Sequence, residues 1–174
     1  MQKIFISYSR KDIDFVRKLA ADLEKAAYDV WWDITDLQGG DDWVKTLPAA
    51  IAESPLFIIV LTPNSIKSEW VQKEYTQALN LHKKIVPIMT DLCEVPFALN
   101  TINFIDFMNN DYVTGFGKLL KAIGHSGEAP AVTPFEKVTA SLPLNLRKYA
   151  LPIFIVLLLI AFGALLFKPK PAPP

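Results

Sequence analysis

Short apolar runs alternate with amphipathic segments along the first 125 residues of this 174-residue chain. The run Leu56–Leu61 is apolar throughout, which is typical of a parallel strand that is covered on both faces. After Asp12, which we expect to cap a helix, apolar residues recur with helical spacing from Phe15 to Leu23. The pattern predicts five strands, at Lys3–Tyr8, Asp29–Trp32, Leu56–Leu61, Ile85–Met89 and Phe104–Phe107. Three later helices are expected from Asp42 through Ser54, where Pro48 should bend or shorten the helix, from Ser68 to Leu81, and over Asp111–Ile123.

Strands that alternate with helices favour right-handed crossovers and a parallel sheet. We therefore expect an α/β domain over residues 1–125, with a flavodoxin-like five-stranded parallel sheet and helices on both faces. For the strand order 2-1-3-4-5, ligands bind between the carboxyl ends of the first and third strands, where the winding reverses. The segments that follow those strands are Tyr8-Ser9-Arg10 and Thr62–Ser68, and the loop Asp33–Asp42 can fold over the same edge. A ligand site is therefore expected at this edge.

The run Tyr149–Phe167 holds 19 residues without a charge. As a helix it spans roughly 29 Å, close to the thickness of a hydrocarbon core. Arg147 and Lys148 flank one end, and Lys168 and Lys170 flank the other. A buried core helix in a chain of this size should show a polar face, and this run shows none. The run therefore predicts a single transmembrane helix.

The C-terminal region divides into three parts. Residues 126–148 form a basic, Pro-containing tether, 149–167 form the transmembrane helix, and 168–174 form a Pro-rich tail or the start of a linker to a further domain. The apolar stretch near the N-terminus is too short for a signal peptide. We therefore expect a single-pass membrane protein whose N-terminal domain lies in the cytoplasm.

Charge and cysteine content narrow the function classes. Residues 1–125 carry 13 Lys and Arg against 16 Asp and Glu, whereas residues 126–174 carry 5 against 2. An acidic domain without a basic stripe disfavours a nucleic-acid partner. Cys93 is the single cysteine, and with only His82 and His125 it leaves no disulfide framework and no zinc-ligand set, so no metal is expected.

The loop over residues 33–42 contains four carboxylates and a Gly pair. No Gly-Lys-Ser/Thr follows, so it is not a phosphate-binding loop, and Val44 stands where an EF-hand requires Glu. It is either a solvated loop or a lid or protein-contact loop. A receiver domain is excluded, because the first and third strands lack the aspartates that bind magnesium and accept phosphate.

Trp70 and Glu74 are four residues apart on an expected helix, so they lie about one turn from each other. A flat aromatic ring beside a carboxylate could hold a planar cationic ring and stabilise an adjacent sugar cation. In the alternative interpretation, Trp70 packs in the core and Glu74 is a surface residue.

Several segments resemble a known family. Phe5-Ile6-Ser7-Tyr8-Ser9-Arg10 with Asp12 resembles the first box of a bacterial Toll/interleukin-1 receptor (TIR) domain, Asp33 to Gly40 resembles its BB loop, and Ser68 to Glu74 resembles its glutamate-bearing third helix. The resemblance spans about residues 1–123, and Pro48 is a departure from it. It implies catalysis by Glu74 and NAD+ as substrate without a further cofactor. It also implies roles for two groups of residues, one in substrate binding and one in assembly. Substrate would be bound by Tyr8, Ser9, Arg10, Trp70 and Asp33, and assembly would use the BB-loop residues Asp36, Leu37, Gln38, Gly39 and Gly40.

The function that this resemblance implies is NAD+ glycohydrolysis at a membrane, activated by association with other TIR domains. Glu74 would stabilise a ribose cation as nicotinamide leaves, and the products would be nicotinamide and either ADP-ribose or a cyclic ADP-ribose. Two alternatives stay open. One is a non-enzymatic scaffold that signals through TIR–TIR contacts, and the other is the regulatory head of a longer receptor-like chain.

Overall fold

The computed structural model describes residues 1–32 and 43–136. The loop 33–42, the tether beyond residue 136, the expected transmembrane helix 149–167 and the tail 168–174 lie outside these residues. None of the helices in the described part of the chain combines the length and the apolar character that crossing a bilayer requires.

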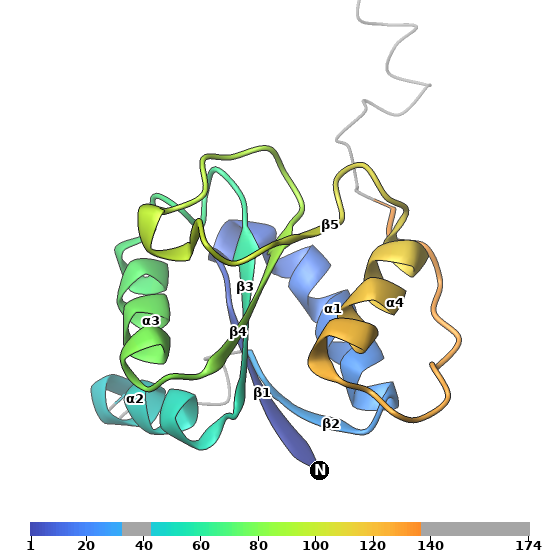
Figure 1. Ribbon diagram of the computed structural model, residues 1–174, viewed down its shortest axis with the longest axis horizontal. Coiled ribbons are helices and arrows are strands. Elements are labelled where there is room, and N and C mark those ends of the chain that lie inside the picture. Colours follow the sequence, from blue (N-terminus) through green and yellow to red (C-terminus); the bar gives the residue numbers. More distant parts are fainter. Residues whose placement is uncertain (33–42, 137–174) are drawn as a thin grey trace, which may run out of the picture. The chain divides into compact units, whose positions relative to one another are not determined.

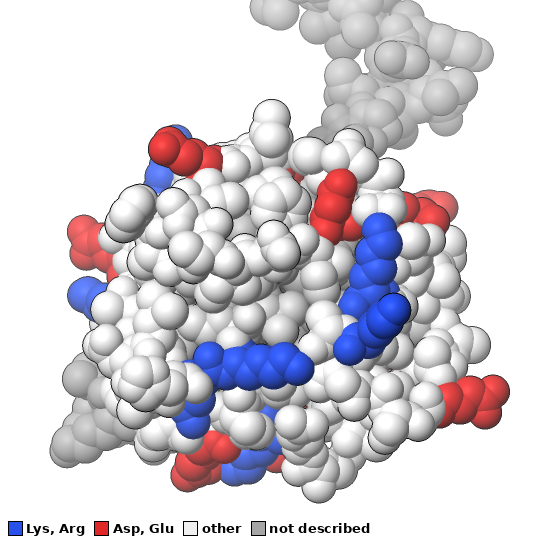
Figure 2. Space-filling view, viewed as in Figure 1, with Lys and Arg blue, Asp and Glu red and all other residues white. Residues whose placement is uncertain are grey.

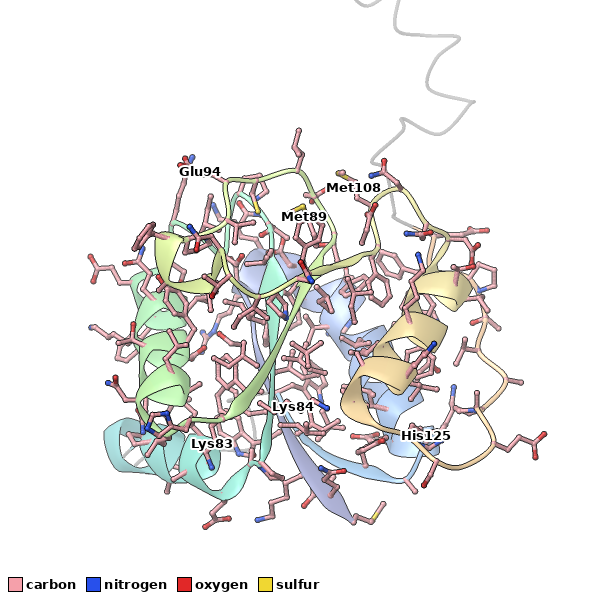
Figure 3. The ribbon with its side chains drawn as sticks, viewed as in Figure 1. Lys83, Lys84, Met89, Glu94, Met108 and His125 are labelled. Atoms are coloured by element: carbon pink, nitrogen blue, oxygen red, sulfur yellow. The ribbon has the colours of Figure 1, made fainter. Side chains whose placement is uncertain are left out.

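Five parallel strands form one sheet in the order β2-β1-β3-β4-β5, as the sequence predicts (Figure 1). The strands are β1 (Gln2–Ser7), β2 (Tyr28–Trp31), β3 (Leu56–Leu61), β4 (Lys84–Met89) and β5 (Ile105–Asp106). The order places the reversal of winding at β1, which pairs with β2 on one side and β3 on the other. Figure 3 shows Lys84 and Met89 at opposite ends of β4, so the carboxyl ends of the strands form the upper edge in this view.

Helices cover both faces of the sheet (Figure 1). One pair is α1 (Ile13–Lys25) with α4 (Tyr112–Ile123), and the other is α2 (Trp43–Glu53) with α3 (Glu69–Asn80). Two short 3-10 turns, η1 (Arg10–Asp12) and η3 (Phe97–Leu99), follow β1 and β4. Pro48 lies inside α2, and the helix continues through it, so the expected shortening does not occur.

The central strand β3 explains the unbroken apolar run in the sequence. Leu56, Ile58 and Val60 pack in the core beneath α1 and α4. Phe57, Ile59 and Leu61 pack in the second core, beneath α2 and α3. Because successive side chains of a strand point to opposite faces, a strand between two cores needs apolar residues at every position.

Part of the expected tether packs on the domain. The compact unit extends from Met1 to Glu136, beyond the expected boundary at residue 125. Val132 and Phe135 contact the core, and the Phe135 ring lies edge-on to Phe15 with 5.4 Å between centroids. This segment contains Pro130 and Pro134 and has no helical or strand period, so the sequence pattern does not reveal its packing.

Charges of both signs lie on the face of the molecule that Figure 2 shows. On the face shown in Figure 2, basic and acidic side chains are interspersed and do not gather into a basic stripe.

Candidate active site

Helix α3 directs Glu74 toward the sheet. Ser68 caps the helix, and its side chain accepts a hydrogen bond from the backbone N–H of Val71. The buried residues of α3 are Val71, Glu74 and Ala78, which fall on one stripe of the helix. Glu74 is therefore a carboxylate at a position that would ordinarily hold an apolar residue, and it is only 8% exposed.

Ser7 is the hydrogen-bond partner of this carboxylate. It is the last residue of β1 and is fully buried, and its hydroxyl donates to Glu74 Oε2 over 2.5 Å. From the sequence alone, Ser7 is only part of a motif. A signal was nevertheless present, since Ser7 is a polar residue on the strand face that also carries Phe5, where apolar residues are expected.

Burial changes the acidity of Glu74. Removal from water opposes the charged form and raises the pKa of the Glu74 carboxyl from 4.5 to about 7, although the hydrogen bond from Ser7 opposes this rise. A carboxyl group whose pKa lies near neutrality inside a hollow is typical of functional sites.

The hollow beside Glu74 lies at the carboxyl end of β1. It is lined by Phe5, Ile6, Tyr8, Arg10, Trp31, Trp32 and Glu74. Its volume is about 40 Å³, which is room for water and less than the cavities known to bind a benzene-sized ring. The structure thus brings together Tyr8, Arg10 and Glu74, three of the residues expected at the site.

Two tryptophans, which the sequence pattern predicts only as strand residues, complete the walls of this hollow. Trp31 stacks on Phe5 with 4.8 Å between ring centroids, and Phe5 stacks in turn on Phe57. The Trp32 ring lies 6.4 Å from that of Tyr8. The strand β2 ends at Trp31, one residue earlier than expected, so these neighbouring indoles lie where the strand meets the loop.

Other expected site residues lie elsewhere. Trp70 is 44% exposed, with Lys73 Nζ 4.5 Å from its ring centroid, and it does not line the hollow. Ser9 caps the turn η1 and is not part of the wall. Asp33 and the BB-loop residues Asp36 to Gly40 lie outside the described residues.

Asp12 stands at the N-cap position of α1, as expected, but its side chain links the two loops at the switch point. Its side chain makes no capping hydrogen bond. It accepts instead from Thr62 Oγ1 over 2.7 Å and from Asn64 Nδ2 over 3.1 Å. Thr62 and Ser65 also exchange hydrogen bonds between their side chains and backbone amides. The loop after β1 is thereby tied to the loop that leads from β3 to α3, which carries Glu74.

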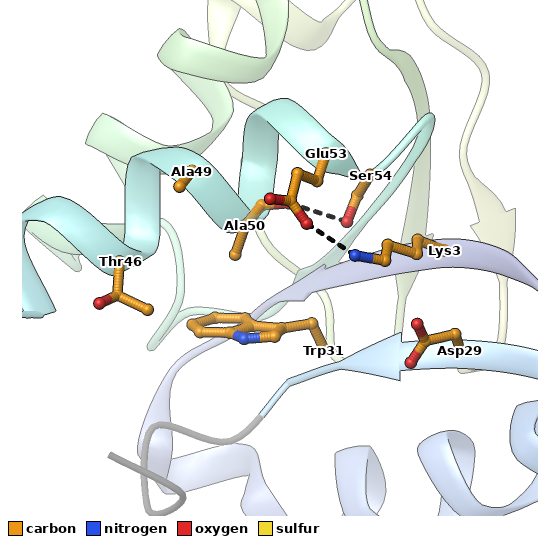
Figure 4. Close-up of a pocket in the computed structure, with 8 residues that line it drawn as sticks. All are labelled: Lys3, Asp29, Trp31, Thr46, Ala49, Ala50, Glu53 and Ser54. Atoms are coloured by element: carbon orange, nitrogen blue, oxygen red, sulfur yellow. Dashed lines mark hydrogen bonds and ion pairs between the residues drawn. The ribbon is translucent and has the colours of Figure 1, made fainter. Parts of the chain in front are cut away.

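A second crevice of about 200 Å³ lies between α2 and the edge strand β2 (Figure 4). Lys3 and Glu53 form an ion pair of 2.6 Å at its rim, and the ion pair raises the pKa of Lys3 and lowers that of Glu53. Its remaining lining residues are Asp29, Trp31, Thr46, Ala49, Ala50 and Ser54. The Lys3 and Glu53 charges compensate each other, and Asp29 is exposed, so no carboxylate that lines this crevice is buried as Glu74 is.

Metal ligands do not gather in the described ranges. Over residues 1–32 and 43–136, no group of three or more His, Cys, Asp and Glu side chains is arranged to hold a metal ion.

This chain is similar to known proteins in both sequence and fold. A family model described as TIR domain matches residues 4–120. NAD(+) hydrolase PdTIR of Paracoccus denitrificans is 36% identical over 90 residues, which are 49% of this chain and 30% of that protein. The 2′ cyclic ADP-D-ribose synthase BtTIR of Bacteroides thetaiotaomicron is 32% identical over 89 residues, which are 48% of this chain and 31% of that protein. The match thus spans about a third of the length of these curated relatives.

A solved structure supports the same assignment. The TIR domain of the Toll-related receptor TRR-2 from Hydra magnipapillata has a TM-score of 0.60 and 27% sequence identity to this chain. The superposition covers 68% of this chain and 94% of that one. With a family model that matches more than half of its residues, this chain belongs to the TIR domain family.

Proposed function

We propose that this chain is a membrane-anchored NAD+ glycohydrolase that releases nicotinamide and is activated by self-association. The observation that carries the proposal is Glu74, a buried carboxyl group that shares a hollow with Tyr8 and Arg10 at the switch point of the sheet. The names of two relatives, an NAD(+) hydrolase and a 2′ cyclic ADP-D-ribose synthase, support the same chemistry.

The proposed reaction breaks the bond between the nicotinamide nitrogen and C1′ of the ribose. The bonding electrons go to the pyridinium ring, so nicotinamide departs as a neutral molecule and needs no general acid. Positive charge develops on the ribose, and the ionised Glu74 carboxylate stabilises it. Addition of water at C1′ with loss of one proton gives ADP-ribose, whereas attack by a nucleophile within the same molecule gives a cyclic product.

The walls of the hollow supply the remaining interactions. Aromatic side chains suit a planar cationic ring, and Trp31, Trp32 and Tyr8 line the hollow. Among the described residues that line the hollow, Arg10 is the basic one, and it is suited to the pyrophosphate, which it can meet through paired N–H donors.

Self-association accounts for two features of the single chain. Its hollow is smaller than a nicotinamide ring, and Trp70 lies on the surface outside it. We propose that a neighbouring copy enlarges and completes the site, with Asp36 to Gly40 at the contact. Attachment through residues 149–167 would favour this by raising the local concentration of the domain.

Chromatography of the products tests the proposal. The full-length chain in lipid vesicles, incubated with NAD+, should release nicotinamide, and the rate per chain should rise as the density of chains increases. The Glu74→Gln variant should lose roughly 100-fold or more of this rate, because it removes the charge that stabilises the ribose. Glu69→Gln is the matched control, since Glu69 is an exposed carboxylate in the first turn of the same helix. Equal activity of both variants would refute the role of Glu74.

The scaffold alternative is favoured by the small volume of the hollow. It predicts no nicotinamide release at any density of chains, together with capture of other TIR domains that is lost when residues 36–40 are changed. Product analysis and partner capture on the same preparations separate the two functions.

A further inference from the structure

The contact between Ser7 and Glu74 joins two different elements of the fold. Ser7 belongs to β1, where its backbone is held in register with Ile59 of β3. Glu74 belongs to α3, which packs on the sheet from one side. The hydroxyl of Ser7 bonds Glu74 Oε2 over 2.5 Å, with both side chains buried. The strand therefore provides a fixed donor for a carboxylate that is carried by a separate helix.

An apolar residue would be the ordinary choice at position 7. The face of the sheet beneath α2 and α3 is otherwise built from residues such as Phe5, Phe57 and Ile59. A buried hydroxyl there loses its contact with water, and this loss is offset only if the hydroxyl finds a partner in the protein. Ser7 finds that partner in Glu74, and a hydrogen bond to a charged acceptor is stronger than one between neutral groups.

We propose that Ser7 is a positioning residue for the Glu74 carboxylate. Its hydroxyl holds Oε2 in place and favours the ionised form, so that Oε1 is the oxygen that meets the ribose. This inference rests on the proposed cleavage of NAD+ at Glu74 and adds the group that prepares Glu74 for it.

The groups around Glu74 leave Ser7 as the residue whose hydrogen bond favours its ionised form. Tyr8 and Arg10 are the titratable side chains that line the hollow together with Glu74, and β2 contributes the uncharged Trp31 and Trp32. On α3 itself, Glu69 and Lys73 lie on the exposed surface. Besides burial, the hydrogen bond from Ser7 is the cause that moves the pKa of Glu74, and it lowers that pKa.

The pH dependence of kcat in Ser7 variants tests the proposal. Ionised Glu74 is the active form, so activity falls on the acid side as Glu74 takes up a proton. Ser7→Ala removes the donor, which should move this acid limb to higher pH and lower kcat at pH 7 roughly tenfold. Activity should largely return at alkaline pH. Ser7→Thr keeps a hydroxyl and should hold the limb near its position in the unchanged protein.

Ser54→Ala is the matched control. Ser54 is also a buried serine, but its hydroxyl donates to the backbone oxygen of Ala50 within α2. This variant should leave the acid limb unchanged. If Ser7→Ala lowers kcat equally at every pH, the Ser7 hydroxyl does not favour ionised Glu74 and the proposal is overturned.

A titration of the Glu74 carboxyl carbon by NMR separates the two possible failures. If the unchanged protein releases no nicotinamide while the titration of Glu74 moves to higher pH in Ser7→Ala, the contact with Ser7 is correct and the proposed function is wrong. If nicotinamide is released but neither the titration nor the acid limb moves, the proposed function stands and the role of Ser7 is wrong.

Discussion

Glu74 is buried, although an ionised carboxylate is more stable in water than in the interior of a protein. Burial raises its pKa from 4.5 to about 7, so the carboxyl is close to half ionised at neutral pH. The unfolded chain exposes the same group with an ordinary pKa. Folding therefore favours protonated Glu74. The proposed reaction needs the ionised form, and this form lowers the free energy of unfolding at neutral and alkaline pH.

Glu74→Gln should make the protein more stable at high pH. Because the pKa of Glu74 is raised in the folded state, its contribution to stability is fully present below pH 4.5 and is lost as the pH rises through about 7. Replacement by a neutral amide removes this loss, which amounts to up to about 3 kcal/mol at pH 8. Urea unfolding of both proteins at pH 5 and pH 8 measures it. A difference that is the same at both pH values would contradict a raised pKa.

At the scale of elements, two contacts hold the ends of the strands in place. Asp12 bridges the loops after β1 and β3 through Thr62 and Asn64. Gly115 allows α4 to approach β5, since a Cβ atom there would lie 2.7 Å from the ring of Phe107. Asp12 is distant in sequence from Thr62 and Asn64, so the helical pattern, which places Asp12 at the start of α1, does not reveal this bridge.

Asp12→Ala should lower the free energy of unfolding by about 1–3 kcal/mol, because it leaves the Thr62 hydroxyl and the Asn64 amide without their acceptor. Asp14→Ala is the matched control, since Asp14 is an exposed carboxylate on α1 that pairs with Arg17. It should change stability by no more than about 0.5 kcal/mol. Urea denaturation of the two variants gives the comparison, and equal losses would argue against the bridge.

Gly115→Ala and Gly117→Ala should have opposite effects, although both replace a glycine in α4. A methyl group at position 115 meets the Phe107 ring, and the overlap should cost about 1–3 kcal/mol. A methyl group at position 117 meets nothing within 4 Å, so the higher helix propensity of alanine should stabilise by up to about 1 kcal/mol. Thermal unfolding of both variants checks the sign. Stabilisation by Gly115→Ala would show that α4 can move away from β5.

The sequence predicts the elements of this fold better than it predicts the site. The unbroken apolar run at Leu56–Leu61 identifies the central strand, and the alternation of strands and helices leads to the observed order. The site depends on which face a residue occupies at the end of a strand. The four-residue spacing of Trp70 and Glu74 does not reveal that Glu74 lies on the buried stripe and Trp70 beside it. Trp31 and Trp32 look like ordinary strand residues until the sheet places them beside Glu74.

At the scale of the whole molecule, the segment after α4 belongs to the domain. Phe135 packs edge-on against Phe15 and lies 6.3 Å from the Tyr112 ring, and Lys18 Nζ donates to Thr133 Oγ1. This segment therefore covers the outer side of α1 and α4. Its contacts come from single residues in a Pro-containing stretch, so no periodic pattern in the sequence predicts them.

Phe135→Ala should lower the free energy of unfolding by about 1–2 kcal/mol, because it exposes part of the aromatic cluster around Phe15 and Tyr112. Phe97→Ala is the matched control, since Phe97 is 89% exposed. It should leave stability unchanged within about 0.5 kcal/mol. Chemical denaturation of the two variants tests whether residues 126–136 are part of the folded unit. Equal effects would place the boundary back at residue 125.

The packing of Phe135 also shortens the chain segment that connects the domain to residue 149. From residue 126 the chain up to residue 148 could extend about 80 Å, whereas from residue 137 it reaches only about 40 Å. Under the proposed anchoring, each domain would stay within a thin layer next to the bilayer. Confinement to such a layer gives a higher local concentration of domains than a long tether would, which would favour the proposed self-association.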